Sequence, residues 1–463
     1  MPTIIKRKKA LSVNPLKTSQ TIGAALAFLG FNRSIPMLHG SQGCTAFGKV
    51  FFVRHFREPI PLQTTAMDQV TTVMGSEESI VEGLKTIAEK NDPLLLGVPT
   101  TGISETQGSD VSLGVNMFRK QHPEFDHIPV VPVATPDYTG CLETGFAKAV
   151  EEIIKVTVPF ADEAGTKPGR QGQQINVLVG SSLTPGDIEE LKEIIEAFGM
   201  HPLVVPDISD SLGYLGADDF SPLTVGGTAA SQLPTMGDAV ATLVVGRSMY
   251  KAADELAKRT KVPDYRFDHL MGLDAVDALI QTLHRLTGEP VPPRIERQRA
   301  QLQDAMLDSH FMLGMARFAI AADPDLLVAL DQMLAGMGAE TVAAVSPINT
   351  PLLQEMTAES VKIGDLEDLE RLASNENAEV LITNTHGVES AKRLGIPLLR
   401  AGFPQYDYVG GFHKTWIGYR GSRQTLFDLA NIMLSLEKGE IHPYRSIYSQ
   451  KGSESSFHTE AVH

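Results

Sequence analysis

Short apolar runs recur along the whole chain, and each leads into a turn of Gly, Ser, Thr or Pro and then into a segment with helical periodicity. This alternation is typical of α/β domains with parallel sheets, because each parallel strand needs a crossover helix to reach the next. A chain of 463 residues is also long enough for about three such domains. The sequence therefore predicts several parallel α/β domains in succession.

The apolar runs fall into three blocks. We expect domains over residues 1–160, 174–295 and 296–437, with a linker rich in Gly, Lys, Gln and Pro before the second and an irregular tail over 438–463. Thr184 and Pro185 have the residue types of an N-cap and a first helical position, and they predict a helix that ends on Gly199. The runs that predict buried strands are Ile35–Leu38, Leu94–Val98, Ile128–Val133, Ile175–Val179, Leu203–Val205, Leu243–Val245, Phe318–Ala321, Thr341–Val345 and Val380–Thr383.

Charge and cysteine content exclude several functional classes. The formal net charge is −16 and the pI is near 5.3, which disfavours binding to nucleic acid or to anionic lipid. The two cysteines, Cys44 and Cys141, cannot form a disulfide framework, and they are too few for a zinc site made of this chain's thiols alone. The sequence has no signal-type apolar segment and no run of about 20 apolar residues. We therefore expect a cytoplasmic protein under reducing conditions.

The turn from His39 to Cys44 is the first candidate site, because ligands of open parallel sheets bind at the carboxyl ends of the strands. A thiol at the start of a helix faces unpaired N–H groups and the positive end of the helix dipole, which favours the thiolate that binds metal. Gly40 and Gly43 would let the backbone approach a bulky inorganic ligand. The alternative is that Cys44 is a buried cysteine that packs as a small hydrophobic residue.

Two further patterns leave alternatives open. Gly43, Gly48 and Lys49 have the spacing of a phosphate-binding loop, but Val50 stands where a hydroxyl should bind magnesium, so a nucleotide-binding enzyme is the least favoured reading. Cys141 also follows a glycine after a predicted strand. It is either a spare metal ligand or a packed thiol, with packing favoured.

Six short motifs occur in a single order, and together they are more specific than any one of them. They are HGSQGC at residues 39–44, FREP at 56–59, TTG at 100–102, TPDYTGC at 135–141, GFPQYD at 402–407 and GYRG at 418–421. In this set the chain resembles the β-type chains of the nitrogenase molybdenum-iron protein superfamily. It is most similar to the β-like subunits of the scaffold on which the iron-molybdenum cofactor is assembled, and the resemblance covers nearly the whole chain.

The resemblance implies a fold, partners and cofactors. The fold would be three Rossmann-like domains with parallel sheets flanked by helices, in an α2β2 heterotetramer with a NifE-like partner chain. The nitrogenase iron protein would dock on this complex, and NifB would donate the cofactor precursor. The precursor and the maturing iron-molybdenum cofactor would be held mainly by the partner chain. No independent substrate reduction is expected.

The chain also departs from the catalytic β chains that it resembles. Those chains carry two further cluster cysteines, where this sequence has Leu62 and Gly102, which cannot bind iron. A 4Fe-4S cluster takes four thiolates. The resemblance therefore implies such a cluster at the subunit interface, with Cys44 as the one metal ligand from this chain and His39, Gly40 and Gly43 beside it. A catalytic nitrogenase β chain with an unusual ligand set remains the second reading, and Cys141 occupies the place of a serine near the cluster of the catalytic chains.

Overall fold

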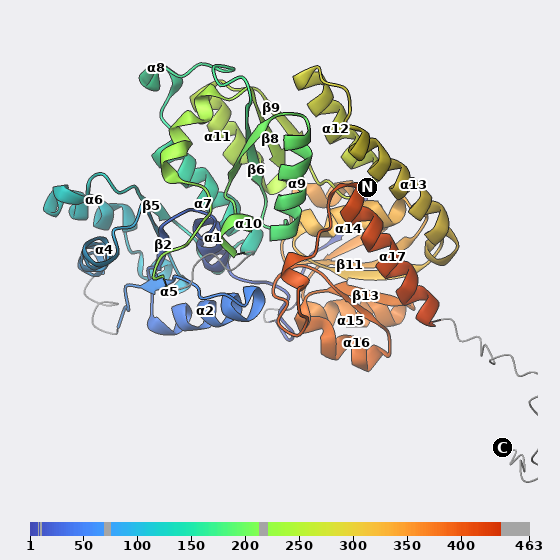
Figure 1. The fold of residues 1–463 in the computed structure, drawn as a ribbon. Coiled ribbons are helices and arrows are strands. Elements are labelled where there is room, and N and C mark those ends of the chain that lie inside the picture. The colour runs from blue at the N-terminus through green and yellow to red at the C-terminus, as the bar shows by residue number, and fades with distance from the viewer. Residues whose placement is uncertain (8, 10–11, 69–75, 213–220, 437–463) are drawn as a thin grey trace, which may run out of the picture.

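The computed structural model shows three parallel β-sheets with helices packed around them, which confirms the predicted α/β class (Figure 1). It describes residues 1–7, 9, 12–68, 76–212 and 221–436. The tail predicted over 438–463 lies outside the described residues. None of the described helices is both long enough and apolar enough to cross a membrane.

The first sheet, on the left of Figure 1, has the strand order β3-β2-β4-β5, and the second, at the top, has the order β7-β6-β8-β9. The strands of the first sheet are β2 (Ser34–Leu38), β3 (Gln63–Thr64), β4 (Leu95–Pro99) and β5 (Val130–Val133). The helices in this part of the chain are α1 (Gln20–Leu29), α2 (Gln42–Phe56), α4 (Glu77–Asn91), α5 (Gly102–Gln107), α6 (Val111–Gln121), α7 (Leu142–Thr157) and α8 (Ala161–Ala164). The strands of the second sheet are β6 (Gln174–Val179), β7 (His201–Val205), β8 (Ala241–Val245) and β9 (Asp264–Phe267). The helices in this second part are α9 (Pro185–Ala197), α10 (Ser209–Leu212), α11 (Tyr250–Thr260) and α12 (Leu273–Thr287).

The third sheet, on the right of Figure 1, has the order β1-β12-β11-β10-β13-β14. Its strands are β1 (Thr3–Ile5), β10 (Arg317–Ala321), β11 (Glu340–Ser346), β12 (Ser360–Ile363), β13 (Val380–Thr383) and β14 (Leu398–Arg400). The helices in this last part are α13 (Pro293–Leu313), α14 (Pro324–Ala335), α15 (Leu366–Asn375), α16 (Val388–Leu394) and α17 (Gly418–Leu436). The domain bounds stay a prediction, but strand pairing assigns Thr3–Ile5 to the third sheet, whereas we expected residues 1–160 to form one domain.

The predicted start of helix α9 illustrates how the sequence sets local structure. The Thr184 hydroxyl accepts a hydrogen bond from the backbone N–H of Asp187 at 3.0 Å, and Pro185 occupies the first turn. The helix ends at Ala197, and Gly199 follows with a φ of +75°, a conformation that favours glycine. Both helix signals in the sequence are therefore confirmed.

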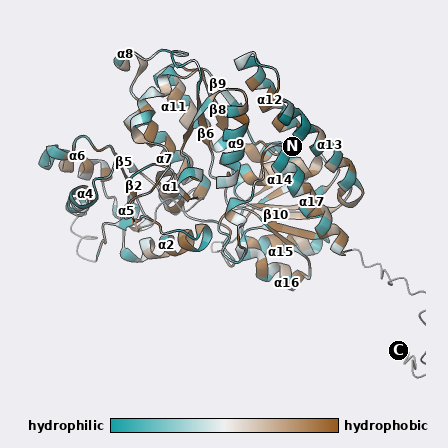
Figure 2. Ribbon diagram, viewed as in Figure 1, coloured by the Kyte–Doolittle hydropathy of each residue, from teal (hydrophilic) through white to brown (hydrophobic). Residues whose placement is uncertain are grey.

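One continuous apolar core joins the three sheets. It contains Phe146 from the first part of the chain, Val177 from the second and Leu330 from the third, each buried. The apolar strands lie inside and the helices carry mixed polar and apolar residues around them (Figure 2). Since the three parts share a core, the junction between them is a fixed part of the structure.

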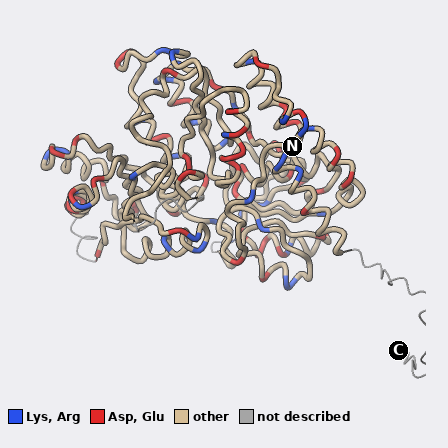
Figure 3. Tube along the Cα trace, in the orientation of Figure 1, with Lys and Arg blue, Asp and Glu red and all other residues tan. Residues whose placement is uncertain are grey.

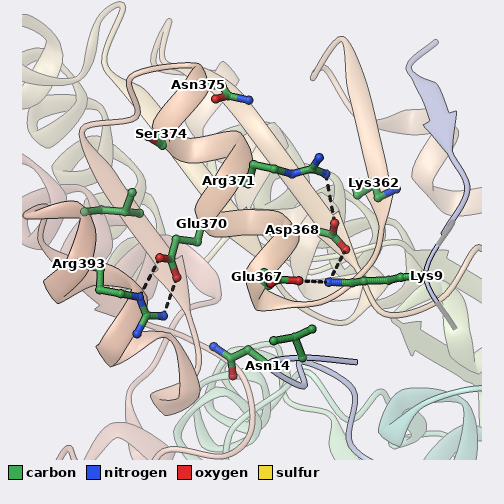
Figure 4. A pocket seen from close by; sticks show the side chains of 12 residues that line it. Lys9, Asn14, Lys362, Glu367, Asp368, Glu370, Arg371, Ser374, Asn375 and Arg393 are labelled. Atoms are coloured by element: carbon green, nitrogen blue, oxygen red, sulfur yellow. Dashed lines mark hydrogen bonds and ion pairs between the residues drawn. The ribbon is translucent and has the colours of Figure 1, made fainter. Parts of the chain in front are cut away.

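Charged residues of both signs are interleaved along all three parts of the chain (Figure 3). A cavity of about 970 Å³ lies between the N-terminal segment and α15. Lys9 reaches across it, with its Nζ 2.7 Å from Asp365 and 2.6 Å from Glu367 (Figure 4). Strand β1 and Lys9 together attach the N-terminal segment to the third sheet.

We expect the substitution Lys9→Met to loosen this N-terminal segment. Methionine keeps the apolar stem but leaves the buried Asp365 carboxylate without its ammonium partner, which should lower the free energy of unfolding by about 1–2 kcal/mol. Limited proteolysis should then cut near the N-terminus more rapidly. The control is Lys392→Met, which removes an exposed ion pair with Glu389 and should change stability by less than about 0.5 kcal/mol. Equal rates of proteolysis for the two variants would contradict the proposal that Lys9 attaches the N-terminal segment to the third sheet.

Candidate functional site

Cys44 lies in the first turn of helix α2, where the sequence placed it. Ser41 precedes the helix in an extended conformation, and its Oγ lies 3.5 Å from the Cys44 Sγ. The side chain of Cys44 is exposed, so the alternative of a buried, packed cysteine at this position is wrong. An exposed thiol beside the free N–H groups of a helix start is suited to bind a metal or an inorganic cluster.

Helix α2 carries an exposed apolar face that begins at Cys44. Phe47, Val50 and Val53 follow it at intervals of three residues, with 71%, 51% and 40% of their surfaces exposed. On the other side of the helix, Phe52 is buried in the core. Apolar side chains gathered around a thiol on a protein surface are typical of a surface that another chain covers.

His39 fixes the turn before α2 rather than presenting a free ring. Its Nδ1 lies 3.0 Å from the Thr65 hydroxyl, and its Nε2 lies 3.0 Å from the hydroxyls of Ser76 and Ser109. Burial lowers the pKa of the imidazole to about 4, so the ring is neutral at pH 7. Both ring nitrogens are hydrogen-bonded inside this chain, and His39 therefore contributes to the site by holding the end of strand β2 in place.

The two glycines of the turn have different roles. A Cβ on Gly40 would lie 2.2 Å from the Thr101 Oγ1, and that hydroxyl donates to the backbone carbonyl of His39 at 3.0 Å. Gly40 thus allows the ends of β2 and β4 to pack together. A Cβ on Gly43 would meet nothing within 4 Å, which leaves open space next to Cys44. The geometry fits one cysteine ligand to a bulky cluster at this point.

The phosphate-loop reading of the same segment is wrong. Residues 43–49 lie within helix α2, so Gly48 and Lys49 belong to helical turns and not to a loop. A phosphate-binding loop needs its N–H groups turned inward around the anion before the helix begins. Residues 43–49 therefore do not form a nucleotide-binding loop.

Cys141 is a packed thiol in this structure. It is fully buried at the N-cap of α7, where its backbone N–H donates to the Thr144 hydroxyl at 2.8 Å. The Asp323 carboxylate is a neighbour of the thiol. Burial raises the pKa of the Cys141 thiol well above its usual range, and the neighbouring Asp323 and Glu143 carboxylates raise it further. The structure thus favours packing over a role as a spare ligand.

Leu62 and Gly102, which replace two cluster cysteines of the catalytic β chains, contribute to packing and to a helix start in this chain. Leu62 is buried in the core with Phe52, under helix α2. Gly102 begins α5, and its N–H donates to the Asp137 carboxylate at 3.0 Å. In the part of the chain that the structure describes, no group of three or more His, Cys, Asp and Glu side chains is placed to hold a metal ion. A cluster on Cys44 would need its other ligands from outside these residues.

The far end of α2 is attached to the third part of the chain, a contact that sequence reasoning missed. The backbone N–H of Gln405 donates to the His55 Nδ1 at 2.8 Å, and the Arg54 guanidinium lies 4.0 Å from the centre of the Tyr406 ring. Burial lowers the pKa of His55 to about 3, so it is a neutral acceptor. The Arg57 guanidinium of FREP also donates to the backbone carbonyl of Tyr406 in GFPQYD at 2.8 Å. These two motifs therefore meet at one end of the helix that carries Cys44, although the two residues are 349 positions apart in the sequence.

Comparisons with known proteins identify the family of this chain. Residues 19–434 match the family described as nitrogenase component 1 type oxidoreductase. The chain belongs to this family. It is 45% identical over 442 residues to the nitrogenase iron-molybdenum cofactor biosynthesis protein NifN of Nostoc sp. (strain PCC 7120), which covers 95% of this chain and 97% of that protein. It is 42% identical over 460 residues to NifN of Klebsiella pneumoniae, covering 99% and 98% of the two chains.

A solved structure shows the same fold. The chain titled nitrogenase Cp1 at pH 6.5 superposes with a TM-score of 0.88 at 30% sequence identity, covering 96% of this chain and 99% of that one. The similarity to nitrogenase component 1 proteins, and within them to NifN, is therefore confirmed by sequence and by fold. The roles of Cys44, His39, Gly40 and Gly43 are not tested by these comparisons and stay predictions.

Proposed function

We propose that this chain is the β-like subunit of a scaffold complex on which the nitrogenase iron-molybdenum cofactor is matured. The similarity to NifN proteins, which are named for biosynthesis of the iron-molybdenum cofactor, extends over nearly the full length of both chains and supports a role in biosynthesis of this cofactor. Membership of the component 1 family supports a complex of several subunits. The partner would be a NifE-like chain in an α2β2 heterotetramer, with NifB as precursor donor, and the complex would work in the cytoplasm.

One observation carries the proposal: the exposed thiol of Cys44 stands alone at the edge of an apolar face. Cys141 is buried, and Leu62 and Gly102 offer no sulfur, so this chain supplies one thiolate. Three thiolates from the partner would complete a 4Fe-4S cluster, which would supply electron transfer when bound. Phe47 and Val50 would be covered by the same partner. The maturing cofactor would be held mainly by the partner chain.

The same features weigh against a catalytic β chain. A double-size cluster needs three thiolates from each chain, and the described residues of this chain present only Cys44 on the surface. The iron protein would therefore dock on this complex to support maturation and not dinitrogen reduction.

Two assays on the co-purified complex test the proposal. The complex should mature precursor into a cofactor that activates cofactor-free nitrogenase, and it should reduce neither dinitrogen nor acetylene when supplied with iron protein and ATP. The chain purified without its partner should be nearly free of iron, because three of the four thiolates are missing. Substrate reduction by the purified complex at rates typical of nitrogenase would favour the catalytic reading instead.

A further inference from the structure

A cavity of about 600 Å³ lies where the three parts of the chain meet. Lys148 of α7 lines it from the first part, Arg247 and Lys251 from the second, and Asp325 and Leu352 from the third. Arg247 follows strand β8, and Asp325 follows strand β10. The cavity is thus outside the carboxyl ends of parallel strands, the usual place for a ligand in this class of fold, and its volume suits a small metabolite.

Two ammonium groups at this cavity lack a counter-charge. Among the described residues, Lys148 and Lys251 form neither an ion pair nor a hydrogen bond. Arg247 is different, because its guanidinium contacts Asp268 at 2.8 and 2.7 Å. The larger cavity of Figure 4 is different too, since Lys9 and Arg393 each contact carboxylates there. Two uncompensated positive charges at one cavity attract an anion.

The carboxyl groups at the same cavity offset only part of this positive charge. Glu143 accepts a hydrogen bond from the backbone N–H of Asp325 at 2.9 Å, and burial raises the pKa of Glu143 well above its usual range. The same burial disfavours the ionised form of Glu143. Asp325 is engaged by the Ser248 hydroxyl, which donates to it at 2.6 Å. Burial raises the pKa of Asp325 to about 6, so it stays mostly ionised at pH 7 with no cationic partner among the described residues. Glu151, which also lines the cavity, is paired with Lys155 at 2.6 Å. The two lysine ammonium groups therefore outnumber the one carboxylate at the cavity that lacks a cationic partner.

The remaining wall of the cavity is mostly carbon. Ala147, Pro351 and Leu352 contribute apolar surface between the charged groups. A bare inorganic ion would leave this surface in contact with water, whereas a carbon skeleton would cover it. We propose that the junction cavity binds a small organic anion with two negative charges, held by Lys148 and Lys251 and packed on this apolar wall.

Calorimetry on the full chain, co-purified with its partner, tests the proposal with three probes. Succinate carries its charges on two carboxylates, glycerol 3-phosphate carries them on one phosphate ester, and inorganic phosphate has no carbon skeleton. At least one organic probe should bind more tightly than inorganic phosphate. The double substitution Lys148→Gln and Lys251→Gln should weaken that binding at least tenfold. Lys258→Gln is the matched control, because Lys258 is on the same helix α11 but contacts Glu255 outside the cavity.

Each outcome decides a part of the proposal. Tight succinate or glycerol 3-phosphate binding that is lost only in the double variant supports it and identifies the anionic group. Failure of both organic probes to bind at millimolar concentration, or equal binding by the double variant, overturns it. Inorganic phosphate binding as tightly as the organic probes overturns the role of the apolar wall. Cys44→Ala should leave this binding unchanged, so the result is independent of the proposed cluster.

Discussion

Replacing Cys44 by alanine should remove up to about four iron atoms per pair of chains from the purified complex, because a cubane cluster that loses one of four thiolates exposes an iron to solvent. The brown colour and the electron paramagnetic resonance signal of the cluster should fall together with the iron. The substitution should leave the fold intact, since the side chain is exposed and its Sγ makes only a long contact, 3.5 Å, with the Ser41 hydroxyl. Elemental analysis and electron paramagnetic resonance of the complex measure the effect.

Cys141→Ser is the matched control for this experiment. Serine is close to cysteine in size and is a favoured N-cap residue, so it can replace Cys141 at the buried N-cap of α7, and the complex should retain its iron and its spectrum. Full iron content in Cys44→Ala would contradict the proposed ligand. Loss of iron in Cys141→Ser, with an unchanged melting temperature, would show that the buried thiol reaches the cluster after all.

The sequence predicted the central strands of the sheets better than the strands at their edges. Ile175–Val179 and Val380–Thr383 are buried on both faces, so they form continuous apolar runs that stand out from their surroundings. The edge strands Asp264–Phe267 and Leu398–Arg400 are partly exposed and carry charged residues, so their apolar runs are absent or short. Thr3–Ile5 could not be assigned to the third sheet, because its partner strand lies more than 350 residues away.

In the candidate site, too, the features set by neighbouring residues could be predicted from the sequence, and those set by tertiary contacts could not. The placement of Cys44 at a helix start follows from the glycines and the apolar run next to it, and the structure agrees. The partners of His39, which are Thr65, Ser76 and Ser109, come from separate elements that only tertiary packing brings together. The junction cavity depends on all three parts of the chain, although the position of Asp325 after a strand was a usable signal.

Gly145→Ala should have the largest effect on folding of the single substitutions considered. Helices α1 and α7 pack so closely that a Cβ on Gly145 would lie 1.9 Å from the backbone carbonyl oxygen of Gln20. Backbone atoms cannot move aside as a flexible side chain can, so the two helices must separate. We expect a loss of about 3 kcal/mol or more, measured as a lower melting temperature and a smaller yield of soluble chain.

The control for this prediction is a glycine-to-alanine substitution at a helical position where the added Cβ meets no neighbouring atom. Gly43 lies in the first turn of α2, and a Cβ there would meet nothing within 4 Å. Gly43→Ala should therefore raise the stability of the isolated chain by up to about 1 kcal/mol, because alanine favours the helical conformation. If Gly145→Ala lowers stability and Gly43→Ala raises it, then the close crossing of α1 and α7, and not helix propensity, determines the effect at Gly145. Equal melting temperatures of the Gly145→Ala and unsubstituted chains would contradict the crossing.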